Sequence, residues 1–165
     1  MGGARKVEMK RLRTTFESAG MNSVRTYINS GNVIFDPPAG QAPLRCTLED
    51  AIEAEFGFRV MVLLRDAQNI GRIVARLPDG WTNDREAKCD VLFLAEEVDF
   101  PAILEGLTVR ADVDEVVYVP GALLWHVSRP LVTRSGMMKL VGTDLYANMT
   151  VRNCNTVRKL DGLMR

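Results

Sequence analysis

The chain has few residues suited to cross-linking or metal binding: three cysteines and one histidine among 165 residues. Cys46, Cys89 and Cys154 are odd in number, lie far apart and form no C-x-x-C pair. A disulfide framework and a zinc site are therefore both unsupported, and the sequence predicts neither a metal nor a cofactor.

Long apolar runs are also missing. No stretch reaches the roughly 18 apolar residues of a membrane span. The amino-terminal Met-Gly-Gly-Ala-Arg-Lys lacks the apolar segment of a signal peptide. The sequence therefore predicts a cytoplasmic protein with no membrane partner.

What is present is ordinary for a packed protein: the 47% hydrophobic and 25% charged residues suit one medium domain or two small ones. The net charge is zero, but acidic residues predominate over 79–118 and basic residues over 125–165. Such asymmetry can steer an anionic partner toward the second region. A solvated charged face is the plainer explanation, and we favour it.

Two stretches of the chain, 62–73 and 149–160, resemble each other without a gap. Each reads as a strand that runs into a helix, with Asp66 as the helix cap in the first and Asn153 in the second. The sequence therefore predicts an internal repeat and two similar halves. Further matched pairs are Arg65 with Arg152, Ile70 with Val157, Arg72 with Lys159 and Ile73 with Leu160.

Residue periodicity and turn signals predict the elements of each half. The first half contains a helix over Val7–Ala19, strands over Val24–Ile28 and Val33–Phe35, a helix capped by Thr47 and ended by Gly57, a strand over Arg59–Leu64 and an Asp66-capped helix ending at Leu77. The second contains a strand over Cys89–Ala95, a helix capped by Asp99, a hairpin of Glu115–Val119 with Leu123–Ser128, a short helix over Met137–Val141 and the closing strand and helix.

Residues 79–87 show no periodicity, so we interpret them as a linker between domains at 1–78 and 88–165. The second half then reads as β-α-β-β-α-β plus a helix, which is the ferredoxin-like arrangement. The first half matches it except for a missing leading strand. The predicted fold class is α+β, with two ferredoxin-like halves as an internal repeat.

Several motifs together carry a resemblance to a bacterial family. They are Gly2-Gly3, Lys6-Val7, the hairpin over Val24–Val33, Val91–Leu94, Trp125-His126, Arg134–Leu140 and Thr150–Leu160. Over essentially the whole chain they resemble the family called domain of unknown function 1697 (DUF1697). The resemblance implies a cytosolic two-part α+β protein without an established activity. Family members open with a strand before the Gly-Gly, so we expect a longer natural product.

The densest group of basic residues gathers around the expected start of the last helix. Free backbone N–H groups and the helix dipole favour an anion there. The candidate ligand-binding residues are Arg134, Lys139, Arg152, Asn153, Arg158 and Lys159, together with Ser135. Against this, Asn153 is explained as a cap, Arg158 and Lys159 as the exposed face of a helix, and no glycine-rich phosphate loop accompanies them.

The hairpin tip offers a second set of polar residues, Asn29, Ser30 and Asn32. They can present side chains to a ligand, but a turn explains them slightly better. Arg25 and Tyr27 on one strand face resemble the stacking surface of RNA-binding sheets, although the aromatic signature of that class is missing.

Catalytic candidates are weak. His126 is the only histidine, and sequence shows no partner for it. Ser135 and Lys139 have the spacing of a serine–lysine pair, but Ser135 is equally suited to a helix cap.

The favoured function is binding of a small anionic or nucleotide-like ligand near the start of the final helix. The alternatives are a small hydrolase or transferase that uses His126 or Ser135 with Lys139, and an RNA-binding module or one that dimerises through sheet edges.

Overall fold

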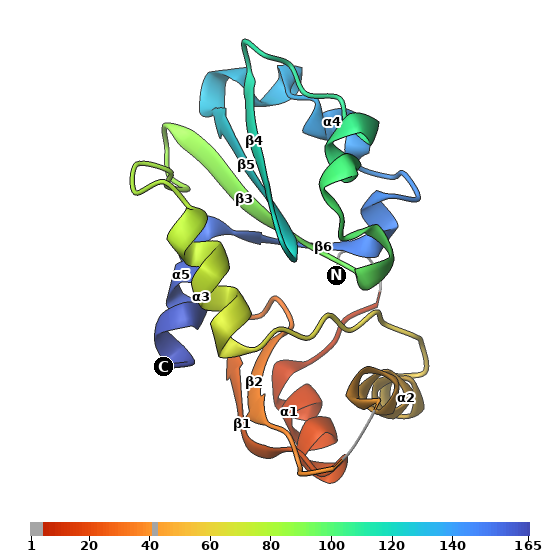
Figure 1. Cartoon of the computed structure of the whole chain (residues 1–165). Helices are drawn as coiled ribbons and strands as arrows, with labels where there is room; N and C mark the ends of the chain where they lie inside the picture. Colours follow the sequence, from red (N-terminus) through yellow and green to blue (C-terminus); the bar gives the residue numbers. More distant parts are fainter. Residues whose placement is uncertain (1–4, 41–42) are drawn as a thin grey trace. The chain divides into compact units, whose positions relative to one another are not determined.

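The computed structural model describes residues 5–40 and 43–165 as a mixed α+β protein with two antiparallel sheets, one of two strands and one of four (Figure 1). The chain divides into two compact units, the first ending at Leu64 and the second beginning at Arg65. This division comes earlier in the chain than the linker expected at 79–87; the domains 1–78 and 88–165 stay predictions. No helix of the described residues is long and apolar enough to cross a membrane.

The first unit packs two helices with a hairpin. Its elements are α1 (Met9–Ser18), β1 (Asn22–Tyr27), β2 (Asn32–Asp36) and α2 (Leu44–Phe56). The predicted hairpin is confirmed, with Arg25 opposite Ile34 and Tyr27 opposite Asn32. Its buried core contains Leu12, Phe16, Met21, Val24, Leu48 and Ile52.

Two predictions in the first unit are wrong. The helix α2 begins at Leu44, so Thr47 lies inside its first turn, and the Thr47 hydroxyl donates to the Pro43 carbonyl instead of capping. Residues 59–64 are extended but pair in neither sheet of the described chain. The backbone N–H of Val62 donates instead to the Glu49 carboxylate at 3.0 Å.

The second unit contains the four-stranded sheet, in the order β4-β5-β3-β6 with every neighbouring pair antiparallel. The first strand of the unit, β3, therefore lies inside the sheet. The elements are α3 (Ala67–Arg76), β3 (Ala87–Leu94), 3₁₀ turns at Glu96–Val98 and Pro101–Gly106, β4 (Asp114–Val119), β5 (Ala122–Ser128), a 3₁₀ turn at Arg129–Arg134, α4 (Met137–Leu140), a 3₁₀ turn at Tyr146–Asn148, β6 (Met149–Asn153) and α5 (Cys154–Leu163).

The two helix caps predicted from the sequence at Asp66 and Asn153 are confirmed. The Asp66 side chain accepts from the backbone N–H of Asn69 at 2.7 Å, and that of Asn153 accepts from Thr156 at 2.9 Å. The prediction that Asp99 caps a helix is wrong. The Asp99 carboxylate accepts from the Tyr118 hydroxyl and from the Gly121 N–H instead. The segment that follows Asp99 is a 3₁₀ turn, not an α-helix.

The two faces of the second sheet are covered differently. Helices α3 and α5 lie side by side, with α5 also against β3 and β6 (Figure 1). On the other face lies the main apolar core of Leu92, Leu94, Leu123, Trp125 and Val127, with Leu140 of α4 packed into it. Neighbouring residues of a strand point to opposite faces, so this division decides which candidate residues can meet.

Candidate functional site

The start of α5 holds part of the predicted anion site. Strand β6 leads directly into this helix of ten residues, and Asn153 caps it. Asn155 and Lys159 are exposed there, whereas Cys154 is buried. Because the first turn of a helix presents backbone N–H groups, this end of α5 carries positive potential.

Arg158 is fixed beside this first turn by two backbone carbonyls. Its guanidinium donates to the oxygen of Trp81 at 2.7 Å and to that of Pro78 at 3.0 Å. The same Nη1 atom lies 3.6 Å from the Sγ of Cys154. Both carbonyl partners are formally neutral, so they orient the Arg158 charge without cancelling it.

Arg152 is placed differently from the sequence expectation. It is half-buried on β6, where Nη1 donates to the Val151 carbonyl at 2.8 Å, and burial lowers the pKa of the guanidinium. Arg65, which the sequence comparison aligned with Arg152, also donates to carbonyls, those of Leu94 and Gly121, and burial also lowers its pKa. Arg65 thus holds backbone segments that are far apart in the chain, whereas this bond of Arg152 goes to its neighbour in sequence.

The remaining basic candidates lie on the other face of the sheet. Ser135 donates to Asp114, which also accepts from the indole of Trp125, and Trp125 belongs to the core of that face. Arg134 pairs with exposed Asp112 at 3.3 Å. The structure thus separates Arg134, Ser135 and Lys139 from the start of α5.

Asp114 explains why Ser135 is held where it is. Four donors converge on its buried carboxylate: the N–H groups of Arg110 and Gly136, each at 2.9 Å, the indole of Trp125 at 3.0 Å and the Ser135 hydroxyl. Burial alone would raise the pKa of Asp114, but these hydrogen bonds outweigh it and hold the pKa below its ordinary value. The Ser135 hydroxyl is committed to this carboxylate, and Lys139 is exposed.

His126 has a carboxylate partner that the sequence did not show. Its Nδ1 lies 3.1 Å from the Glu115 carboxylate, and its ring stacks on Trp81 with centroids 4.9 Å apart and planes 13° apart. Across the sheet, Glu115 stands opposite His126, and His126 opposite Cys89. A carboxylate, an imidazole and a thiol thus form one cross-strand row.

The hairpin candidates lie in the first unit, where they build a turn. Asn32 is buried, and its amide donates to the Tyr27 carbonyl at 3.2 Å. Asn29 and Ser30 occupy the turn itself, next to Ile28, which has a positive φ of 49°. The turn explanation of Asn32 agrees with this bond.

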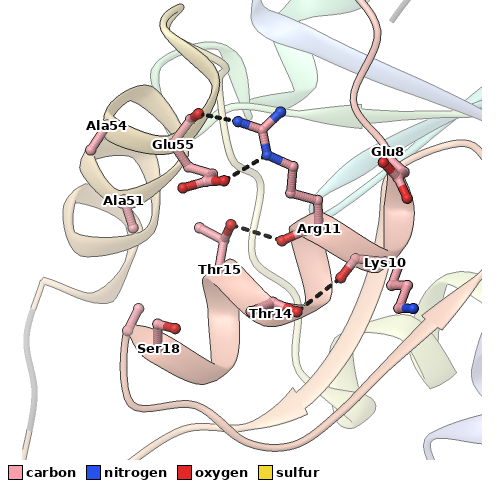
Figure 2. A pocket seen from close by; sticks show the side chains of 10 residues that line it. Glu8, Lys10, Arg11, Thr14, Thr15, Ser18, Ala51, Ala54 and Glu55 are labelled. Carbon is pink, nitrogen blue, oxygen red and sulfur yellow. Dashed lines mark hydrogen bonds and ion pairs between the residues drawn. The ribbon is translucent and has the colours of Figure 1, made fainter.

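A separate groove of about 630 Å³ lies between α1 and α2 of the first unit (Figure 2). Arg11 reaches across it to the Glu55 carboxylate at 2.6 Å, and the hydroxyls of Thr14 and Thr15 bond carbonyls of their own helix. None of the ligand-binding or catalytic candidates from the sequence lines this groove.

Sequence reasoning missed one feature of the α5 site. Cys89 and Cys154, which are 65 positions apart in the sequence, are neighbours in the structure, and each thiol shifts the pKa of the other. Asp90 pairs with Asn153 across β3 and β6, so Cys89 before Asp90 and Cys154 after Asn153 lie on the same side of this pair. The only sequence signal was that Cys154 directly follows a strand, and the strand order needed to use it was unknown.

Comparison with known proteins places the chain in a family. The model of a family described as "Protein of unknown function (DUF1697)" matches residues 1–125. No curated protein matches the chain. A solved structure, that of the conserved bacterial protein SP0830 from Streptococcus pneumoniae, is similar with 26% sequence identity and a TM-score of 0.83, over 100% of this chain and 93% of that one. Most of the candidate residues described above, from His126 onward, lie beyond the part that the family model matches. The chain belongs to the DUF1697 family of proteins of unknown function.

Proposed function

We propose that this protein binds a small oxyanion or nucleotide-like phosphate at the first turn of α5. One observation carries the proposal: Arg158 is held by two neutral carbonyls, at 2.7 and 3.0 Å. Among residues 5–40 and 43–165, the ion pairs found include none to Arg158 or Lys159. An oriented guanidinium without a carboxylate partner, beside a helix start, suits an anionic ligand.

The neighbouring groups support a ligand with a phosphate-like charge. Lys159 adds an exposed positive charge on the same helix. The Asn155 side chain donates to the Asn83 carbonyl at 2.8 Å and accepts from the Asn83 N–H at 3.3 Å, so it ties the 78–83 loop to the first turn. The Trp81 ring, stacked on His126, lies on the loop whose carbonyl holds Arg158. Arginine suits oxyanions because its planar donors match two oxygens at once.

We also infer the finer fold prediction, a ferredoxin-like second half. Support comes from the sheet order β4-β5-β3-β6, in which the leading strand β3 lies between β5 and β6. The parallel roles of Arg65 with Arg152 and of Asp66 with Asn153 support the proposed repeat.

A thermal-shift screen of inorganic phosphate, nucleotides and sugar phosphates tests the binding proposal. A ligand that binds only the folded state raises Tm by mass action. We expect a phosphate compound to raise the Tm of the unsubstituted protein, and we expect Lys159→Ala to reduce that rise. Arg158→Gln should abolish it. Lys139→Ala, an exposed lysine on the other face, is the matched control and should leave the shift unchanged.

Because Arg158→Gln also removes two bonds to the loop, the ligand-induced shift is compared within each variant and not between variants. The proposal fails if no phosphate compound changes Tm, or if Lys139→Ala reduces the shift as much as Lys159→Ala does.

Catalysis at His126 is the second candidate, favoured by the 3.1 Å contact with Glu115. A carboxylate in that position can orient an imidazole as a general base. If so, His126→Gln lowers the hydrolysis rate of an activated ester such as p-nitrophenyl acetate by about 100-fold. Equal rates for the variant and the natural chain would exclude this role.

A further inference from the structure

Two of the three cysteines form a buried pair in the second unit. Strands β3 and β6 are antiparallel, with Asp90 opposite Asn153. Cys89 directly precedes Asp90 and Cys154 directly follows Asn153, so the two cysteines come next to each other at the end of this antiparallel pairing. Both have 0% exposure. Each thiol shifts the pKa of the other, and the Cys154 thiol lies 3.4 Å from the Trp81 carbonyl oxygen. Cys46 is separate from them because it belongs to the first unit, where it is exposed.

The backbone spacing at this place suits a covalent link. Residues opposite each other in an antiparallel pair have Cα atoms about 4.5–5.5 Å apart. Disulfides join residues whose Cα atoms are about 4.4–6.8 Å apart. Cys89 and Cys154 flank such a pair on the same side, one before Asp90 and the other after Asn153, so a bond between them requires little movement of β3 or α5.

The surroundings make the two thiols chemically unequal. The hydrogen bond from Cys89 lowers the pKa of Cys154, burial opposes this, and the Arg158 charge lowers it further. The same hydrogen bond and burial raise the pKa of Cys89. Cys154 also begins a helix, a position that stabilises a thiolate. One sulfur is thus suited to attack as a thiolate, while the other keeps its proton.

We propose that Cys89 and Cys154 form a reversible intrachain disulfide with a hydroperoxide as the oxidant. This modification site goes beyond the proposed anion binding and does not depend on it. The bond would tie the first turn of α5 to β3 and would remove the thiolate charge beside Arg158.

The reaction balances in two steps with hydrogen peroxide. The Cys154 thiolate attacks one peroxide oxygen, the O–O bond breaks, and the departing hydroxide takes a proton to become water. The Cys89 sulfur then attacks the sulfur of the resulting Cys154 sulfenic acid, and an S–S bond forms. The S–O bond breaks, and the departing hydroxide takes the Cys89 proton and leaves as a second water. The sulfurs together lose two electrons, and the peroxide gains them.

The test uses the full chain carrying Cys46→Ser, so that only the buried pair remains. After treatment with hydrogen peroxide, the protein is denatured, alkylated with N-ethylmaleimide and weighed intact. We expect a mass lower by two hydrogens, no alkylation, and a linked peptide pair that contains Cys89 and Cys154. Reduction with dithiothreitol should restore two alkylation sites, and Tm should be higher in the oxidised state.

Two variants in the same background complete the test. Cys154→Ser should leave Cys89 reduced and available for one alkylation. Cys89→Ser should let the Cys154 sulfenic acid accumulate, which dimedone traps. If Cys154→Ser fails to fold, Cys154→Ala replaces it.

The proposal is overturned if both cysteines still take up N-ethylmaleimide at a peroxide dose that oxidises Cys46 in the natural chain. It is also overturned if Cys154 proceeds to sulfinic acid without a linked peptide. A dimer linked between chains would likewise contradict an intrachain bond.

Discussion

Asp114 is the residue on which most of the local structure around α4 depends. Its carboxylate is buried yet ionised, because four donors from four different residues surround it. It joins the start of β4 to β5 through Trp125 and to the segment before α4 through Ser135 and Gly136. A motif that resembled a catalytic serine–lysine pair in sequence is therefore part of a structural network.

We expect Asp114→Asn to destabilise the protein by about 2–4 kcal/mol, because the new NH₂ group faces donors and leaves them unsatisfied. The pKa of Asp114 is depressed in the folded state. Its stabilisation is therefore present above the unfolded carboxyl pKa of about 3.9 and is lost as the pH falls through the lower folded value.

Thermal unfolding at several pH values from 7 to 3 measures the contribution of the ionised Asp114 carboxylate to stability. The Tm difference between the natural chain and the variant should be constant near neutral pH and should narrow in acid. Asp112→Asn, at an exposed carboxylate, serves as the control and should change Tm little. A Tm difference that grows in acid would contradict the ionised state of Asp114.

Gly136 is required for a close approach of two backbone segments. A Cβ placed there would lie 1.7 Å from the Thr108 carbonyl oxygen. We expect Gly136→Ala to cost about 3 kcal/mol or more, because the backbone has to move. Gly162→Ala is the matched control: it lies in α5 with open space around it, and should stabilise the helix by about 0.5–1 kcal/mol. Urea unfolding of both variants measures the difference, and equal midpoints would contradict the packing described.

At the scale of elements, helices α3 and α5 begin with side-chain caps that sequence alone predicted. Each cap is a hydrogen bond between residues three positions apart, so the sequence pattern that predicts it lies within four consecutive residues. The same holds for the β1–β2 and β4–β5 hairpins, whose turns and alternating residues lie close together in sequence.

Removal of the α5 cap by Asn153→Ala should cost about 1 kcal/mol, because the Thr156 N–H loses its acceptor. Asn153→Asp keeps an acceptor and should restore most of this loss. Chemical unfolding gives the free energies. If the Asn153→Ala and Asn153→Asp variants have the same free energy of unfolding, the hydrogen bond between Asn153 and Thr156 contributes nothing to stability.

Predictions that needed a distant partner failed. Residues 59–64 have the composition of a buried strand, but a strand exists only if a neighbour pairs with it. Asp99 has the right position for a helix cap, yet the Tyr118 hydroxyl and the Gly121 N–H occupy its carboxylate. Both failures come from contacts between residues far apart in the chain.

At the scale of the whole molecule, the α+β class and the family could be predicted from the sequence, whereas the residues that lie together at the site could not. Arg134, Lys139, Arg158 and Lys159 belong to one basic region of the sequence. The sheet of the second unit places Trp125 on one face and His126 on the other, and the basic residues separate accordingly. Strand order, which decides this separation, depends on tertiary packing and leaves no local signal.

The central claim is that the start of α5, with Arg158 beside it, binds an oxyanion. A titration of the ¹⁵N-labelled full chain with inorganic phosphate at constant ionic strength tests it most directly. We predict saturable shifts of the backbone amides of Cys154 and Asn155, absent in Arg158→Gln, with the amides of α4 unchanged. Shifts that never saturate, or that spread equally over α4 and the other basic surfaces, would contradict the claim.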